Sequence, residues 1–176
     1  MKKIFAFTAL AMLISAAAFA AEAKTALGFH SFDAPIGIRT WFNNQVGLDL
    51  GVGLSSNTYT HGSPAVDDKN SGYSLEAGLP YVFKSWDKVK FIGRPGVIYN
   101  TNKQEPAGGT TVKNTNFSVM GELEVELAVA ENVTISMSHG VAFNSSHDDR
   151  TPENKSSGFE TIGNSWSSLG FHVYLW

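Results

Sequence analysis

The chain has 176 residues, of which 43% are hydrophobic, and it carries a formal net charge of −3 at pH 7. This length suits one domain, and the mildly acidic balance gives no basic footprint for nucleic acid, so we expect no nucleic-acid partner. The sequence contains no Cys. We therefore expect neither disulfide bonds nor the lipoprotein type of membrane anchor, which is attached to a Cys.

The first twenty residues have the features of a secretory signal peptide. Lys2 and Lys3 precede an uncharged apolar run over residues 4–19, and Ala18-Phe19-Ala20 supplies the small-x-small pattern of a cleavage site. An N-terminal membrane anchor is the alternative, but the run is short for a spanning helix. The sequence thus predicts a signal peptide over residues 1–20 and a mature domain over residues 21–176.

Apolar and polar residues alternate with period two throughout the mature part, and no helical periodicity is present. In residues 46–54, for example, Val46, Leu48 and Leu50 share one face, while Asp49 lies on the other. The same pattern predicts eight strands, over residues 25–30, 36–42, 46–54, 73–83, 89–99, 117–129, 133–142 and about 167–176. The expected fold is all-β: an eight-stranded antiparallel up-and-down transmembrane β-barrel.

The connections between these strands fall into two classes. Short turns occupy residues 43–45, 84–88 and 130–132. Longer segments, rich in Gly, Asn, Ser, Thr and Asp, occupy residues 55–72, 100–114 and 144–165, and residues 31–35 form a short member of the same class. Their composition predicts solvated loops. Because the two classes alternate, all loops should lie at one end of the barrel and both termini at the other.

The tight turns also predict the register of two hairpins. A turn centred on Asn44 pairs Arg39 with Asp49. A turn centred on Glu131 pairs Val129 with Val133, and Glu126 with Ser136. A one-residue slip would move the charged residues to the apolar face, so the register should be strongly specified.

Two orientations of the strands are open. In a soluble sandwich or lipocalin-like barrel the apolar face points inward, whereas in a membrane barrel it meets lipid and the polar face lines the lumen. The polar face is rich in Gly and carries both signs of charge, which favours a narrow, sealed lumen. Since buried charges need partners, we expect one ion-pair network. Its predicted members are Arg39, Asp49, Glu76, Lys90, Arg94, Glu122, Glu124 and Glu126.

At this point the chain resembles the OmpA/OmpX-like small eight-stranded outer-membrane β-barrels. The resemblance rests on the hairpin over residues 73–99, with Ala77-Gly78 and a turn at Trp86, and on Glu131-Asn132-Val133. Residues 168–175 are similar to the assembly signal of such barrels, although the chain ends at Trp176 where Phe is usual. The assigned signal positions are Gly170, Val173, Leu175 and Trp176.

The resemblance implies a location and partners. A member of this group lies in the outer membrane, crosses it several times and keeps both termini in the periplasm. It contacts outer-membrane lipid and lipopolysaccharide, and it is folded by the barrel-assembly machinery. Residues 55–72, 100–114 and 144–165 would then be exposed outside the cell, where they could contact an extracellular partner.

Several residue clusters have chemistry to weigh. Ser146-His147-Asp148 looks like a catalytic triad, but triads assemble from separate segments, so adjacency in sequence gives no support. Acidic and His side chains of the loops could hold a divalent cation, but they lack the spacing of a dedicated site. These are His61, Asp67, Asp68, His147, Asp148 and Asp149. A solvated loop is the favoured interpretation, and we expect no catalytic residue, no bound metal and no cofactor.

His139 supports one enzymatic alternative. Alternation turns it toward lipid near the loop end, where outer-membrane lipid A deacylases also place a His, although their His-x-Ser-Asn pattern is replaced here by His139-Gly140-Val141. A narrow channel or small-ligand binder is a second alternative, but eight strands enclose a space that side chains just fill. We therefore expect a non-enzymatic outer-membrane barrel with a structural, envelope-integrity or surface-interaction role, such as adhesion or defence, through its extracellular loops.

Overall fold

The computed structural model describes residues 24–29, 31, 34–62, 66–107, 109–149, 154–162 and 168–175. It contains the strands β1 (Lys24–Phe29), β2 (Ile36–Trp41), β3 (Gly47–His61), β4 (Val66–Gly78), β5 (Tyr81–Trp86), β6 (Val89–Glu105), β7 (Val112–Ala130), β8 (Val133–Asp148), β9 (Asn154–Ile162) and β10 (Ser168–Tyr174). In this part of the chain, no helix is long and apolar enough to cross a membrane. The predicted signal peptide, residues 1–20, lies outside the described residues.

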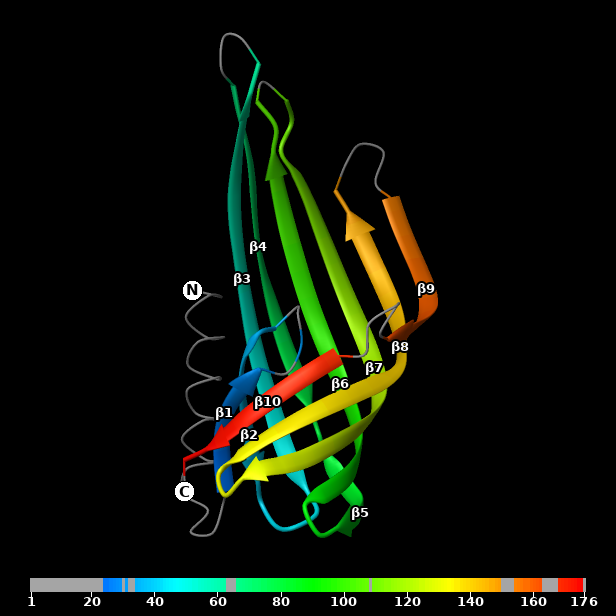
Figure 1. The fold of residues 1–176 in the computed structure, drawn as a ribbon. Coiled ribbons are helices and arrows are strands. Elements are labelled where there is room, and N and C mark those ends of the chain that lie inside the picture. The colour runs from blue at the N-terminus through cyan, green and yellow to red at the C-terminus, as the bar shows by residue number, and fades with distance from the viewer. Residues whose placement is uncertain are drawn as a thin grey trace.

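The strands form one antiparallel barrel (Figure 1). Sequential strands pair in the order β1-β2-β3-β4-β6-β7-β8, and β10 pairs with both β1 and β8, which closes the sheet. β5 continues the path of β4 after a break at Leu79-Pro80, and β9 pairs with β8 beyond the end of β10. With β4 and β5 counted as one barrel strand, and β9 and β10 as another, the described strands form eight barrel strands. The predicted eight-stranded antiparallel barrel is therefore confirmed.

Three long connections were predicted as loops, and this prediction was wrong. The strands continue far into these segments: β3 and β4 pair as far as His61 and Val66, β6 and β7 as far as Gln104 and Val112. The third connection contains the end of β8 and all of β9. The Asn- and Ser-rich composition suggested turns, but pairing with a neighbouring strand already held by the barrel overrides weak β-propensity.

These extensions form one continuous surface, which we call the projecting sheet. Its strands are residues 55–61, 66–72, 100–105, 112–116, 144–148 and 154–158. Lys69 pairs with Glu105, and Asn114 pairs with Asp148, so neighbouring hairpins are joined to one another. In Figure 1 the β3–β4 and β6–β7 hairpins rise far above the barrel, whereas β1, β2 and β10 stay low. The projecting sheet is therefore open on one side.

The turns at the other end fix the register. Arg39 pairs with Asp49, and Glu126 pairs with Ser136, as predicted. The predicted pairing of Val129 with Val133 is wrong, because an irregularity between Ala128 and Ala130 places Ala130 opposite Val133. The β5–β6 turn is also tighter than predicted: Trp86 pairs with Val89, and Asp87 takes a positive φ of 50°.

Side chains sort by face as the membrane orientation requires. Val125 and Ile135 point outward and are 43% and 47% exposed, whereas Glu124 and Arg94 point inward and are each 4% exposed. The same alternation runs along β7 and β8, where outward apolar residues alternate with inward polar ones. The buried core of this barrel is thus largely polar, and its exterior is apolar.

Candidate functional site

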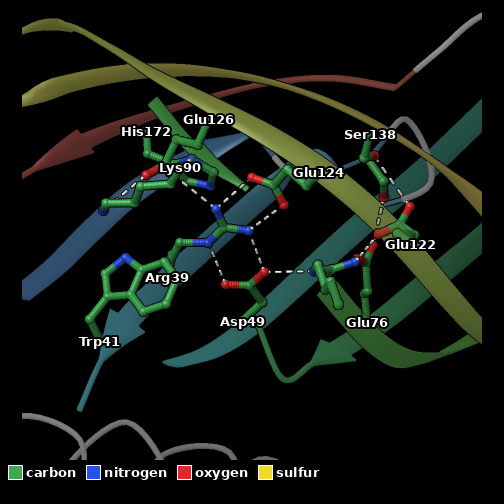
Figure 2. Close-up of polar contacts among 12 residues, drawn as sticks. Arg39, Trp41, Asp49, Glu76, Lys90, Glu122, Glu124, Glu126, Ser138 and His172 are labelled. Carbon is green, nitrogen blue, oxygen red and sulfur yellow. Dashed lines mark hydrogen bonds and ion pairs between the residues drawn. The ribbon is translucent and has the colours of Figure 1, made fainter. Parts of the chain in front are cut away.

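Arg39, on β2, lies at the centre of the buried ion-pair network (Figure 2). Its guanidinium donates two hydrogen bonds to Asp49 on the neighbouring strand, at 2.8 and 2.7 Å. It also reaches across the lumen to β7, where it donates to both carboxylate oxygens of Glu124, at 2.7 and 2.9 Å, and to Glu126 at 3.0 Å. Two bidentate contacts satisfy the planar fork of the arginine and tie opposite walls of the barrel together.

Arg94, on β6, forms the second half of the network. Nε donates to Asp49 at 2.6 Å, and Nη1 donates to Glu122 at 2.7 Å. Nη2 forms an ion pair with Glu76 on β4. Asp49 therefore accepts hydrogen bonds from both arginines and joins the two halves.

Lys90 and His172 extend the network toward the turn end. Lys90 donates to Glu126 at 3.2 Å, and its ammonium lies 5.0 Å from the centre of the Trp41 ring. His172, from β10, places Nδ1 3.6 Å from the same glutamate. In the described part of the chain, five carboxylates thus share one lumen with two arginines and a lysine.

The structure brings all eight predicted network residues together. The hairpin register supplied the Arg39–Asp49 pair, and the neighbouring strands supplied the contacts of Lys90 and Arg94 with glutamates of β7. The contacts of Arg39 across the lumen were not foreseen. The inward His172 and Trp41 were also missed, although alternation with their neighbours places both on the polar face.

Both ends of the lumen are closed by side chains. At the turn end, Trp41, Val82 and Ile92 form a buried apolar cluster, and Trp41 Nε1 donates to the hydroxyl of Tyr174 at 2.8 Å. At the opposite end, Ser31 and Ala34, between β1 and β2, lie against the inner face of the barrel beside Glu76 and Gly51. There Ala34 is fully buried, and Ser31 donates to Glu76 at 2.6 Å.

The space left inside the lumen is small. A gap of about 10 Å³ lies among the two arginines, Glu122, Glu124, Ser136 and His172. A volume of this size accommodates about one water molecule. Among the described residues, the gap inside the arginine network therefore leaves no room for a solute larger than water, and this part of the lumen is a packed structural core.

The exterior forms an apolar belt with aromatic residues near its two borders. At the loop end, Tyr73 and Phe117 point outward, and the Tyr73 ring lies 6.1 Å from that of Tyr99. At the turn end, Phe42, Tyr81 and Phe83 are exposed. The outward stripe of β7 from Phe117 to Leu127 spans about 33 Å along the strand, or roughly 25 Å along the axis at a tilt of ~40°. This height matches the lipid-facing band of a transmembrane barrel.

The loop residues considered for metal binding or catalysis lie on separate hairpins. His61 Nδ1 is 3.7 Å from Asp68 on the β3–β4 hairpin, where Thr60 donates to Asp67. Asp149 accepts from the backbone of Lys113, and Ser146 donates to Asn116. No cluster of three or more metal-ligating side chains occurs among the described residues. Another exposed contact joins Lys103 to Glu105, and its hydrogen bond lowers the pKa of Glu105.

His139 lies on the outward face of β8, paired with Leu123 on β7. Leu123 and the two neighbours of His139 on that face of β8, Met137 and Val141, are exposed apolar residues. Ser138 points the other way and donates to Glu122 at 3.4 Å. Ser138, the serine that precedes His139, therefore faces the lumen and not the side on which His139 lies.

The predicted assembly-signal residues lie on or next to β10. Gly170 pairs with Ser136, and Val173 pairs with both Val133 and Leu27. Leu175 follows β10, and its backbone N–H donates to Thr25. Phe171 points outward and His172 inward, which fixes the outward register of this strand. Trp176 lies outside the described residues.

No known protein family and no curated protein matches this sequence. Among solved structures, the chain is similar to a major outer membrane protein from Thermus thermophilus, at 14% identity and a TM-score of 0.49, over 88% of this chain and 100% of that one. It is also similar to Ail, the attachment invasion locus protein of Yersinia pestis, at 16% identity and a TM-score of 0.43, over 87% and 95% of the two chains.

A third structure, CarO2 of Acinetobacter baumannii, gives 10% identity and a TM-score of 0.36, over 86% of this chain and 97% of that one. The fold assignment itself rests on the strand pairing of this chain. A closed barrel with an apolar belt and a sealed polar lumen satisfies every requirement for spanning a bilayer without helices. Single-chain barrels of this kind are proteins of the bacterial outer membrane, and that is the location to which this architecture belongs.

Proposed function

We propose that this protein is a surface-interaction protein of the outer membrane, in which the barrel is the anchor and the projecting sheet makes contact with external macromolecules, as in adhesion or defence. The observation that carries the proposal is the continuous pairing of six strands beyond the apolar belt. Mobile loops would suffice to connect the strands of the barrel. A paired sheet presents a fixed surface, which costs less entropy to bind than a loop that must first be ordered.

The free edges of this sheet favour the same function. β3 pairs with β2 only as far as Val52, so its continuation to His61 pairs with β4 alone among the described strands. β9 likewise pairs with β8 alone over Asn154–Ile162. A free strand edge offers unpaired backbone N–H and C=O groups, to which an extended segment of a partner can add. The sealed lumen gives the barrel itself no transport path to compete with this role.

The experiment trims the hairpins without disturbing the barrel. Residues 57–70, 103–113 and 147–155 are each replaced by Asn-Gly, a turn suited to a two-residue hairpin. The flanking pairs are Ser56–Ser71, Asn102–Asn114 and Ser146–Ser156, so the register below each cut is retained. Folding is checked by the difference in gel mobility between boiled and unboiled samples.

Bacteria that display the wild type, the trimmed variant or no barrel are compared for attachment to surfaces coated with mucin or matrix protein, and for survival in serum. We expect the wild type to increase attachment or survival, and the folded trimmed variant to behave like cells without the barrel. Equal behaviour of wild type and trimmed variant would refute the proposal, as would a wild type that changes neither property.

A further inference from the structure

The inward face of the projecting sheet carries a set of amide side chains, which we call the amide face. Asn100 pairs with the buried Ser74, and Asn116 precedes the buried Ser118 by two residues, so both point toward the barrel axis. Residues paired with them, or two positions away, share that direction. The members are Asn57, Asn70, Asn100, Asn102, Gln104, Asn114, Asn116, Asn144 and Asn154.

The opposite face of the same strands has different chemistry. Thr58 and Thr60 lie there with the charged Lys69, Lys103 and Lys113. On the inward face of the projecting sheet, the described acidic and His side chains lie near the hairpin tips, at His61, Asp68 and Asp148. Below them on the same face, Glu160 of β9 accepts a hydrogen bond from Asn144 at 2.6 Å. A merely solvated sheet has no reason to separate amides from charges. The segregation points to a ligand on the inward side.

A cleft of about 320 Å³ lies at the base of the amide face. Ser55, Ser74, Asn100 and Asn102 of the inward face line it, with Gly53, with Pro35 from the β1–β2 connection, and with Leu54, Tyr73 and Thr101 of the outward face. This volume falls in the range of small-molecule sites. In the described part of the chain, the buried Oδ1 of Asn100 has no hydrogen-bond partner. By contrast, the side chain of Asn116 bonds to Ser118 and Ser146. Asn100 thus lines the cleft with an acceptor that has no partner within the described residues, and a ligand would reach it only if the side chain turned toward the cleft.

The chemistry of this surface selects a class of ligand. Each amide offers both a donor group and an acceptor oxygen, which matches a sugar hydroxyl that donates and accepts. None of the described residues that line the cleft is ionised, so it does not attract an anion or a cation. Tyr59 shares the inward face two residues from Asn57 and is 57% exposed, so its ring offers an apolar surface for the C–H face of a sugar. We infer that the amide face and its basal cleft bind an uncharged oligosaccharide. This inference rests on the proposed surface role of the sheet and names its ligand class.

The bound sugar can come from the lipopolysaccharide of the cell's own outer leaflet or from an external glycan, and one experiment distinguishes these two sources. Purified protein is placed in nanodiscs of phosphatidylcholine, with or without lipopolysaccharide, and is applied to an array of neutral, sialylated and sulfated glycans. We expect binding to neutral glycans in phosphatidylcholine nanodiscs. Loss of this binding in lipopolysaccharide nanodiscs would identify the sugars of the cell's own outer leaflet as the occupant, whereas retained binding would identify an external glycan. Either result supports the inference.

Matched variants test the face itself. Asn100→Ala combined with Asn102→Ala should weaken neutral-glycan binding about tenfold or more, because roughly two hydrogen bonds are lost. Asn100→Ser alone, which keeps a smaller polar group, checks that the loss does not come from misfolding. Lys103→Ala with Lys113→Ala, on the opposite face, should leave binding unchanged. Binding should also be insensitive to salt, since no charge pair is screened.

Three results would overturn the inference: no binding to any neutral glycan, equal binding by the double Asn variant, or binding to sulfated glycans alone that the Lys variants abolish. The display assay on whole cells keeps this separate from the proposed function. Attachment that is lost on hairpin trimming but retained in the double Asn variant would refute the glycan inference and leave the surface role standing. Attachment unaffected by trimming would refute the surface role, whatever the array shows.

Discussion

The guanidinium of Arg94 lies directly against the α-carbon of Gly78. A methyl group added at Gly78 would be 2.8 Å from Cζ and from Nε of the arginine. Arg94 has little freedom to move away, because hydrogen bonds and ion pairs hold it to Asp49, Glu76 and Glu122. Because Gly78 has no side chain, β4 leaves room for the guanidinium of Arg94. That guanidinium neutralises three carboxylates on the surrounding strands.

Gly78→Ala tests this relationship. The new methyl group should displace Arg94 and weaken its ion pairs, with a loss of about 1 to 3 kcal/mol in the free energy of unfolding, as for other overpacked sites. Urea unfolding of the barrel in lipid vesicles measures it. Gly121→Ala is the matched control, since no atom lies within 4 Å of the added methyl there. Equal stability of the two variants would show that the lumen tolerates the displacement.

Arg39→Met tests the centre of the network. The substitution leaves Asp49, Glu124 and Glu126 without their main cation in a lumen where each is almost fully buried. Breaking such a buried network costs about 3 to 5 kcal/mol. Arg39→Lys should rescue only part of this loss, because an ammonium cannot reproduce two bidentate contacts.

Lys90→Met is the control for the arginine substitution. Lys90 is 38% exposed at its side chain, and its ion pair among the described residues is with Glu126, whereas Arg39 pairs with three carboxylates. Its removal should therefore cost clearly less than the removal of Arg39. The temperature at which unboiled protein loses its folded gel mobility ranks the variants. If the Lys90 variant is as unstable as the Arg39 variant, then Arg39 does not contribute more to the stability of the network than Lys90 does.

The eight barrel strands could be predicted from sequence because apolar and polar residues alternate along each of them. The bilayer constrains one face of each strand, and the lumen constrains the other. In the segment around Asp49, every second residue must be apolar on the lipid side, so the period is plain. The Arg39–Asp49 pair followed from the same pattern, because a short turn fixes which residues face each other.

The projecting sheet could not be predicted in the same way. Both of its faces are polar, so the strand around Asn57 has no hydrophobic period, and its pairing depends on neighbours already aligned by the barrel. The contacts of Arg39 with Glu124 were missed for a related reason. They join strands that are not neighbours, and only the curvature of the closed barrel brings them together.

Leu123→Arg tests the orientation of the barrel in the membrane. Leu123 is exposed on β7 midway along the outward apolar stripe, so an arginine there would face the centre of the hydrocarbon layer. In transmembrane barrels this costs about 2 to 4 kcal/mol. Thr58→Arg places the same side chain on the outward face of the projecting sheet and should cost almost nothing. If both variants unfold in vesicles at the wild-type urea concentration, Leu123 does not face lipid.

The packing of the lumen predicts that the wild-type barrel does not conduct ions. The Trp41, Val82 and Ile92 cluster closes the turn end, and the space between the arginines accommodates about one water molecule. Single-channel recording in planar bilayers should therefore show no discrete conductance steps. Trp41→Ala removes the largest side chain of the cluster and should destabilise the barrel by about 3 to 5 kcal/mol. Because Arg39, Glu124 and Glu126 still fill the lumen behind it, this variant should also fail to conduct. Steady conductance steps in the wild type would show that the arginine network opens, and would favour a channel over an anchor.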